Sequence, residues 1–167
     1  IRESKLCAML PVLPTMRPTP ASVPPTTRGH TRLMGLVTLL FALRVVGQAV
    51  QRWWPQPGLP EFSAFQGSGL PYWVLLSTQL AIVALMLRVW WRMARRAPVP
   101  NRRLGRALMW TGALYMACSL LRIVVGLAVP AAPAWFTAWI PALFHLVLAG
   151  FVLAVADVHL RSSATLV

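Results

Sequence analysis

The sequence predicts an all-α membrane protein, a four-transmembrane-helix bundle built from two tandem helical hairpins. Three observations predict this fold: the composition, the four apolar runs and the placement of the arginines. Of the 167 residues, 57% are hydrophobic and only 11% are charged, whereas soluble domains carry about 25% charged residues. A soluble globule of this size leaves about 30% of its unfolded surface exposed and could not hide so much apolar surface. We therefore expect lipid to surround most of the chain.

The apolar runs follow a polar tail. Residues 1–32 are rich in Pro and Thr, and we expect a disordered or extended cytoplasmic tail because such a composition buries too little apolar surface to offset the entropy of ordering. A four-helix transmembrane domain is expected at 33–160 and a second cytoplasmic tail at 161–167. The expected spans are about 33–50, 70–91, 107–129 and 141–160, which are lengths that cross a hydrocarbon core of about 30 Å.

The connector between the second and third spans is expected to set the topology. Cytoplasmic loops of membrane proteins carry an excess of Lys and Arg, and this connector holds seven arginines and no acid: Arg88, Arg92, Arg95, Arg96, Arg102, Arg103 and Arg106. Arg28 and Arg32 precede the first span and Arg161 follows the last. We therefore expect a multi-pass protein of the bacterial inner (cytoplasmic) membrane, with both termini and the connector in the cytoplasm and two tryptophan-bearing loops outside.

The formal net charge of +13 would point to nucleic acid in a soluble protein. Here the arginines flank apolar runs, so we expect no nucleic-acid partner. The expected partners are the lipid bilayer itself and other membrane-protein subunits.

No cofactor or metal site is predicted. Cys7 and Cys118 are isolated and lack the spacing of a metal site. His145 and His159 lie on one run, about 21 Å apart along a helix, so the chain alone could not hold a haem between two facing histidines.

The sequence also predicts an internal repeat. The segment LRVVGQAV at Leu43–Val50 is similar to LRIVVGLAV at Leu121–Val129, with one inserted residue, and LPYWVLL from Leu70 aligns with IPALFHL from Ile140. Two copies of one hairpin would enter the membrane from the same side, as a parallel repeat. The alternative is that Leu, Val, Gly and Arg recur by chance in a biased composition.

Polar side chains inside the spans are candidates for a binding site, because placing them in lipid is costly. Helical rise puts five of them in one layer of the outer half, with Glu61 in the loop above: Arg44, Gln48, Gln79, Arg122 and His145. One hypothesis is an outward-facing pocket for an anionic head group, a carboxylate or a quinone carbonyl, with His145 as a proton donor. The alternative is structural: the arginines snorkel to the outer head groups, while His145 bonds a backbone carbonyl or Gln79.

Helix contacts are expected at small residues four apart, which let transmembrane backbones approach closely. Such pairs occur at Ala113 and Ala117 in the third span and at Gly150 and Ala154 in the fourth.

The function that the sequence favours is a non-catalytic accessory or structural subunit of a larger membrane complex, because four short spans carry little polar chemistry. The alternative is a small binding or transport protein for an anionic, quinone or lipid ligand that uses the polar layer. GxSxG, HExxH and P-loop motifs are absent. Only His145 offers acid–base chemistry, so an enzyme acting on a lipid or quinone stays open but is not favoured.

Overall fold

A computed structural model of the chain describes residues 25–66, 69–95 and 99–164. Within these ranges all regular structure is helical: α1 (Pro25–Trp53), α2 (Phe62–Gln66), α3 (Tyr72–Arg95), α4 (Arg102–Ala128), α5 (Ala134–Thr137) and α6 (Trp139–Ala164). Four of these helices, α1, α3, α4 and α6, are long and apolar enough to cross a membrane. The predicted fold class is confirmed, and the four helices indicate a multi-pass membrane protein.

The first helix begins earlier than expected. Residues 25–32 belong to the segment expected to be disordered or extended, but α1 starts at Pro25, where a missing N–H costs nothing in a first helical turn. Tertiary contacts hold this stretch: the His30 Nε2 atom lies 2.7 Å from the Asp157 carboxylate, and Trp90 Nε1 donates to the Thr31 carbonyl at 3.1 Å. Composition alone could not foresee these partners. The rest of the expected tail, residues 1–24, lies outside the described residues.

Two helices also extend into the arginine-rich connector. α3 continues to Arg95, and α4 begins at Arg102 after Asn101, whose side chain accepts a hydrogen bond from the Leu104 N–H at 3.0 Å. Asn is a favoured N-cap residue because it satisfies a free helix N–H. Of the seven connector arginines, Arg96 lies outside the described residues.

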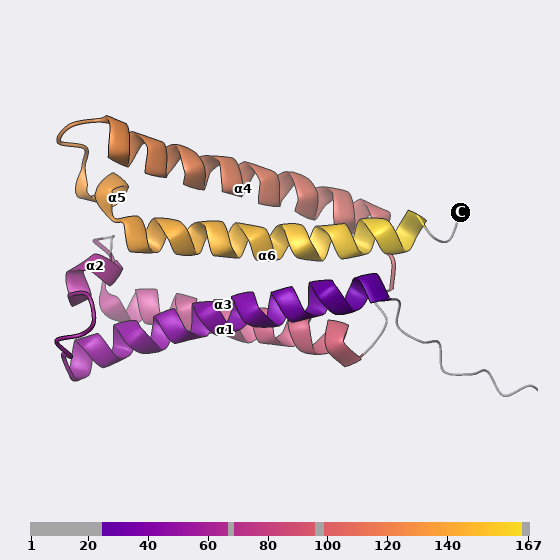
Figure 1. The fold of residues 1–167 in the computed structure, drawn as a ribbon, viewed down its shortest axis with the longest axis horizontal. Coiled ribbons are helices and arrows are strands. Elements are labelled where there is room, and N and C mark those ends of the chain that lie inside the picture. Colours follow the sequence, from indigo (N-terminus) through magenta and orange to yellow (C-terminus); the bar gives the residue numbers. More distant parts are fainter. Residues whose placement is uncertain (1–24, 67–68, 96–98, 165–167) are drawn as a thin grey trace, which may run out of the picture.

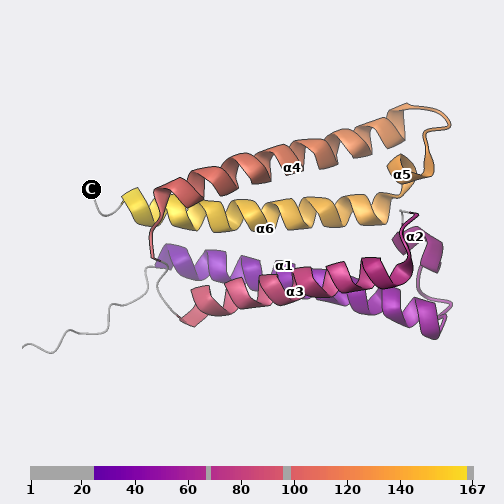
Figure 2. The same ribbon diagram turned by 180° about the vertical axis from the view of Figure 1, so that it is seen from behind.

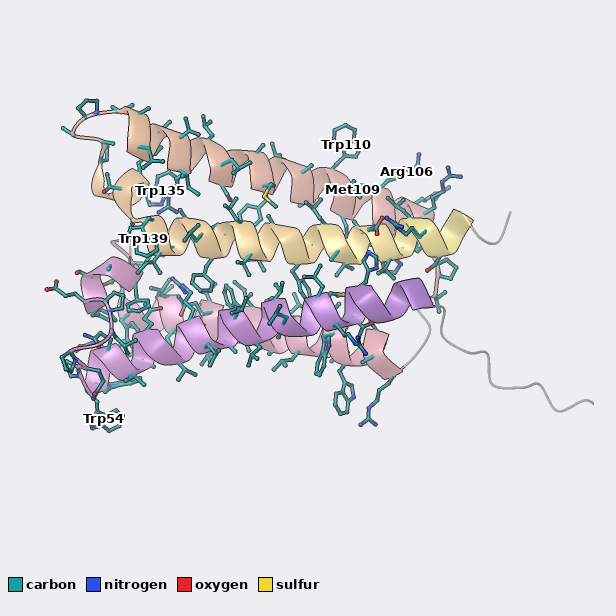
Figure 3. The ribbon with its side chains drawn as sticks, viewed as in Figure 1. Trp54, Arg106, Met109, Trp110, Trp135 and Trp139 are labelled. Carbon is teal, nitrogen blue, oxygen red and sulfur yellow. The ribbon has the colours of Figure 1, made fainter. Side chains whose placement is uncertain are left out.

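The four long helices form two antiparallel hairpins, α1–α3 and α4–α6 (Figure 1). α6 packs on both α4 and α1, and it lies between α4 and the crossed pair α1 and α3 in both views (Figures 1 and 2). The short helices α2 and α5 lie together at one end of the bundle, here called the loop end. The opposite end is called the arginine end: Figure 3 shows Arg106 there, with Trp54, Trp135 and Trp139 at the loop end.

Large apolar side chains fill the space between α1, α3 and α6. Phe41 meets Phe144 edge to face, with ring centroids 6.2 Å apart. The buried residues of this core are Met34, Phe41, Val45, Met86, Phe151 and Ala154.

The α4–α6 hairpin is joined by a different kind of seam. Gly105, Gly112 and Ser119 are buried on α4 at intervals of seven residues, a spacing that keeps side chains on one face of a helix. A Cβ added at Gly112 would lie 2.9 Å from a methyl of Leu153 on α6. The missing side chains therefore let the two helices approach closely.

The small-residue pair predicted for α4 does not lie in the contact with α6. Ala113 and Ala117 are exposed, because the seam uses residues about 100° around the helix from them. In α6, Ala154 is buried, but a Cβ at Gly150 would meet nothing within 4 Å.

Candidate functional site

Polar side chains from all four long helices line one cavity of about 270 Å³ near the loop end. They include Arg44 from α1, Gln79 from α3, Arg122 from α4 and His145 from α6. Four of the five residues of the expected layer are thus brought together. Gln48 is buried, at 1% exposed, but does not line this cavity.

Arg44 is held inside the protein. Its side chain is 9% exposed, its Nη2 donates to the Phe65 carbonyl at 3.1 Å, and its guanidinium lies 5.2 Å from the centroid of the Phe144 ring. Phe65 belongs to the last turn of α2, where carbonyls lack partners within the helix and a cation is favourable. The Nε atom of Arg44 is buried and has no hydrogen-bond partner in the described part of the chain.

Arg122 makes the equivalent contact in the second hairpin. Its side chain is 5% exposed, and its Nε and Nη2 both donate to the Trp135 carbonyl, at 2.9 and 2.5 Å. Nη2 also reaches the Ala138 carbonyl at 3.4 Å, and the guanidinium lies 4.2 Å from the centroid of the Trp135 ring. Each hairpin therefore uses a buried arginine to tie the short helix of its loop to the bundle.

The snorkelling interpretation of these arginines is wrong. Both guanidiniums are buried and bind backbone carbonyls of the protein. The loops supply these carbonyls, because α2 packs on α6 and α5 packs on α4. The sequence analysis expected two outer loops without helices, whereas α2 and α5 form within them.

The partner of His145 also differs from the expectation. Its Nδ1 is hydrogen-bonded to the Tyr115 hydroxyl of α4, rather than to a backbone carbonyl or to Gln79. Sequence reasoning missed Tyr115, although Tyr115, Ser119 and Arg122 are spaced i, i+4, i+7 and so share one helix face. A polar stripe of this spacing in an apolar run was the available signal.

The cavity is positively charged overall. Among the described residues that line it are two arginines and a histidine but no carboxylate. Glu61, expected above the layer, is exposed and near the Ser63 hydroxyl in the loop, at 3.5 Å. The Oε1 atom of Gln79, a residue 5% exposed, is buried without a hydrogen-bond partner in the described ranges. The cavity thus combines positive charge with unused hydrogen-bonding capacity.

A second, apolar cavity of about 850 Å³ adjoins the first and is here called the groove. It is lined by α3, α4 and α6, and Figure 2 shows α6 lying between the other two. Ile82, Tyr115 and Leu148 line both cavities, so the two spaces meet at these residues. Arg92 and His159 lie on the groove toward the arginine end.

The chain matches no protein-family model, no curated protein and no solved structure.

Proposed function

We propose that the protein is a membrane-embedded binding protein that holds the anionic head group of an amphiphile, a carboxylate or a phosphate, in the cavity at the loop end. One observation carries the proposal: two buried guanidiniums line this cavity, and no carboxylate among the described lining residues neutralises them. Buried charges are costly unless they are paired. An anionic head group would supply the missing charge.

The hydrogen-bonding groups of the cavity favour an oxyanion over a neutral quinone. Arg binds carboxylates and phosphates through several parallel N–H donors, and each guanidinium has five N–H groups. The described bonds use only one donor nitrogen of Arg44 and two of Arg122. The Tyr115 hydroxyl and His145, which also line the cavity, add polar contacts for the same head group.

The proposed orientation places the arginine end in the cytoplasm of a bacterial inner membrane and the cavity in the outer leaflet. The described connector arginines support it, because they lie in the last turns of α3 and the first turns of α4, at one end of the bundle. Cytoplasmic segments carry this excess of positive charge.

A thermal-unfolding experiment tests the proposal. The protein is placed in phosphatidylcholine nanodiscs and supplied with dodecyl phosphate, dodecanoate or neutral dodecanol. At a free concentration of about 100 times Kd, a ligand stabilises by about 2.7 kcal/mol, which raises Tm by about 5–10 °C in a chain of this size. We expect this shift with one or both anions and not with dodecanol, and the two anionic arms distinguish phosphate from carboxylate.

The matched variants are Arg44→Gln with Arg122→Gln, and Arg106→Gln as a control at the exposed arginine end. The double variant should lose the shift and the control should keep it. An equal shift in the double variant, or the same shift with dodecanol, contradicts the proposal.

The accessory-subunit hypothesis is a second candidate, favoured by the packing of α3. Within the described ranges the backbone of α3 lies closest to that of α1, and only Gln79 and Met86 of α3 are buried, so most of its surface is available to lipid or to another subunit. Purification in mild detergent tests it: a stoichiometric partner protein supports an accessory role, and a monodisperse particle of this chain alone contradicts it.

A further inference from the structure

We propose that the apolar chain of the bound amphiphile lies in the groove between α3 and α4, and that it enters sideways from the bilayer. This inference rests on the proposed function, since the head group in the loop-end cavity is what fixes the position of the chain. It adds a second binding region with a different chemistry and a route of entry.

The first step is continuity. The groove and the polar cavity share Ile82, Tyr115 and Leu148, so a molecule whose head group lies beside Arg44 and Arg122 has its first carbon atoms at these residues. Beyond this point the groove is apolar as far as Arg92 and His159 at the arginine end, with Met86, Leu108 and Phe151 among the residues that line it. The change from charged to apolar walls matches the change along an amphiphile.

The second step is length. Tyr115, where the groove begins, lies eleven residues from Leu104 near its far end, which is about 16 Å along α4. One leaflet of a bilayer with a hydrocarbon core of about 30 Å is about 15 Å thick. Tyr115 lies near the middle of α4 and Leu104 in its first turn, so the groove runs through the half of the bundle toward the arginine end. It therefore has the length of one acyl chain, which would extend from the head group across the middle of the bilayer.

The third step is access. α3 and α4 form opposite walls of the groove, yet in the described ranges they do not pack on one another as α4 packs on α6. An acyl chain near the middle of the bilayer can therefore pass between them into the groove without crossing a helix–helix contact. Hydrocarbon inside a membrane gains little by leaving other hydrocarbon, so the head group supplies the affinity and the groove supplies the position.

Photolabelling maps the chain directly. A fatty acid and an alkyl phosphate, each with a diazirine at the end of the chain, are added to the protein in phosphatidylcholine nanodiscs, and the labelled residues are read by mass spectrometry. We expect saturable labelling near Leu104, Leu108 and Val155, which line the groove. Excess unlabelled amphiphile should compete with it, whereas labelling at the outward-facing Leu114 and Leu121 should follow concentration without saturation.

Two variants distinguish binding of the acyl chain in the groove from binding of the head group in the loop-end cavity. Leu108→Trp narrows the groove and should lower saturable labelling at least about tenfold, because the larger ring occupies space that the acyl chain would use. Leu114→Trp adds the same volume on the outward face and should leave labelling unchanged. Both variants should keep the thermal shift produced by an anionic head on a short chain, such as octanoate or octyl phosphate, which reports that the variants fold.

The outcomes are distinct. Saturable groove labelling that Leu108→Trp removes supports the inference. If the thermal shift persists but labelling is confined to the outward face, or if Leu108→Trp and Leu114→Trp label equally, the chain lies elsewhere and only this inference is overturned. If the anions produce neither shift nor saturable labelling, the proposed function is overturned with it.

Discussion

The two hairpins share one arginine–carbonyl contact but differ in how closely their helices pack. In both, a buried arginine of the first helix binds a carbonyl of the short loop helix, Arg44 with Phe65 and Arg122 with Trp135. The α4–α6 hairpin adds a row of small residues along its length, whereas α1 and α3 share a core of bulky side chains that includes Met34 and Met86 and have one close approach, of Trp90 to Gly35. The comparison teaches that α4–α6 is the more closely packed unit, and that α3, held mainly by α1, forms the less constrained wall of the groove.

The largest expected effect comes from the paired glycines of the predicted repeat. A Cβ added at Gly126 would clash with the backbone carbonyl oxygen of Phe136, whereas a Cβ at Gly47 would meet nothing within 4 Å. Gly126→Ala should lower the free energy of unfolding by about 2–3 kcal/mol, as overpacking at a rigid contact does, and Gly47→Ala should change it little. Reversible unfolding in mixed micelles measures both. Equal losses of stability from the two changes would contradict the closer approach of loop and helix that the structure shows at Gly126.

The second effect concerns the arginines themselves. Arg122 makes three hydrogen bonds to loop carbonyls and Arg44 makes one, and each bond to a charged group contributes about 1.5–3 kcal/mol, part of which offsets the cost of burying the charge. We expect Arg122→Leu to destabilise more than Arg44→Leu, by about 1–2 kcal/mol. The same unfolding assay compares them, and a larger loss from Arg44→Leu would contradict the account.

A smaller effect tests the seam of the second hairpin. At Gly112 an added Cβ would press on the flexible side chain of Leu153, and at Gly150 it would meet open space. Gly112→Ala should cost about 1 kcal/mol. Gly150→Ala should be neutral or slightly stabilising, since Ala favours helix over Gly. Similar losses of stability from the two changes would mean that α4 does not contact α6 through Gly112.

The smallest expected effect concerns the link between the hairpins at the arginine end. Asp157 of α6 pairs with His30 of α1 and with Arg161 one turn along its own helix, both at 2.7 Å. Partly exposed ion pairs contribute about 0.2–1 kcal/mol, so Asp157→Asn should lower stability by no more than about 1 kcal/mol. His30→Gln removes only the link between helices and should account for part of this loss. A change of several kcal/mol in either variant would mean that the ion pairs, rather than apolar packing, join the hairpins.

Much of the fold could be predicted from the sequence because lipid solvation imposes simple rules. Apolar length sets each span, and arginine clustering marks one end of the bundle. What sequence reasoning missed depends on tertiary contacts: α1 extends back to Pro25 where His30 and Thr31 find partners on other helices. The seam of α4 could not be chosen by spacing alone, since Ala113 and Gly112 both belong to regular small-residue patterns.

The candidate site was predicted in part. Helical rise correctly grouped Arg44, Gln79, Arg122 and His145 at one depth, because depth depends only on sequence position within a helix. The direction of each side chain depends on its hydrogen-bond partners, and the sequence does not show which groups these are. In the structure they are the Phe65 and Trp135 carbonyls and the Tyr115 hydroxyl. The internal repeat, the ligand-binding role of these residues and the accessory role stay predictions.

Native mass spectrometry tests the central claim most directly. The chain and the Arg44→Gln, Arg122→Gln double variant are each released from nanodiscs that contain equal amounts of an acidic and a zwitterionic lipid, and the retained lipid is weighed. The account predicts that the unaltered chain retains an acidic lipid and that the double variant releases it. Equal retention by the two proteins, or a preference for the zwitterionic lipid, would contradict the claim that the two buried guanidiniums bind an anionic head group.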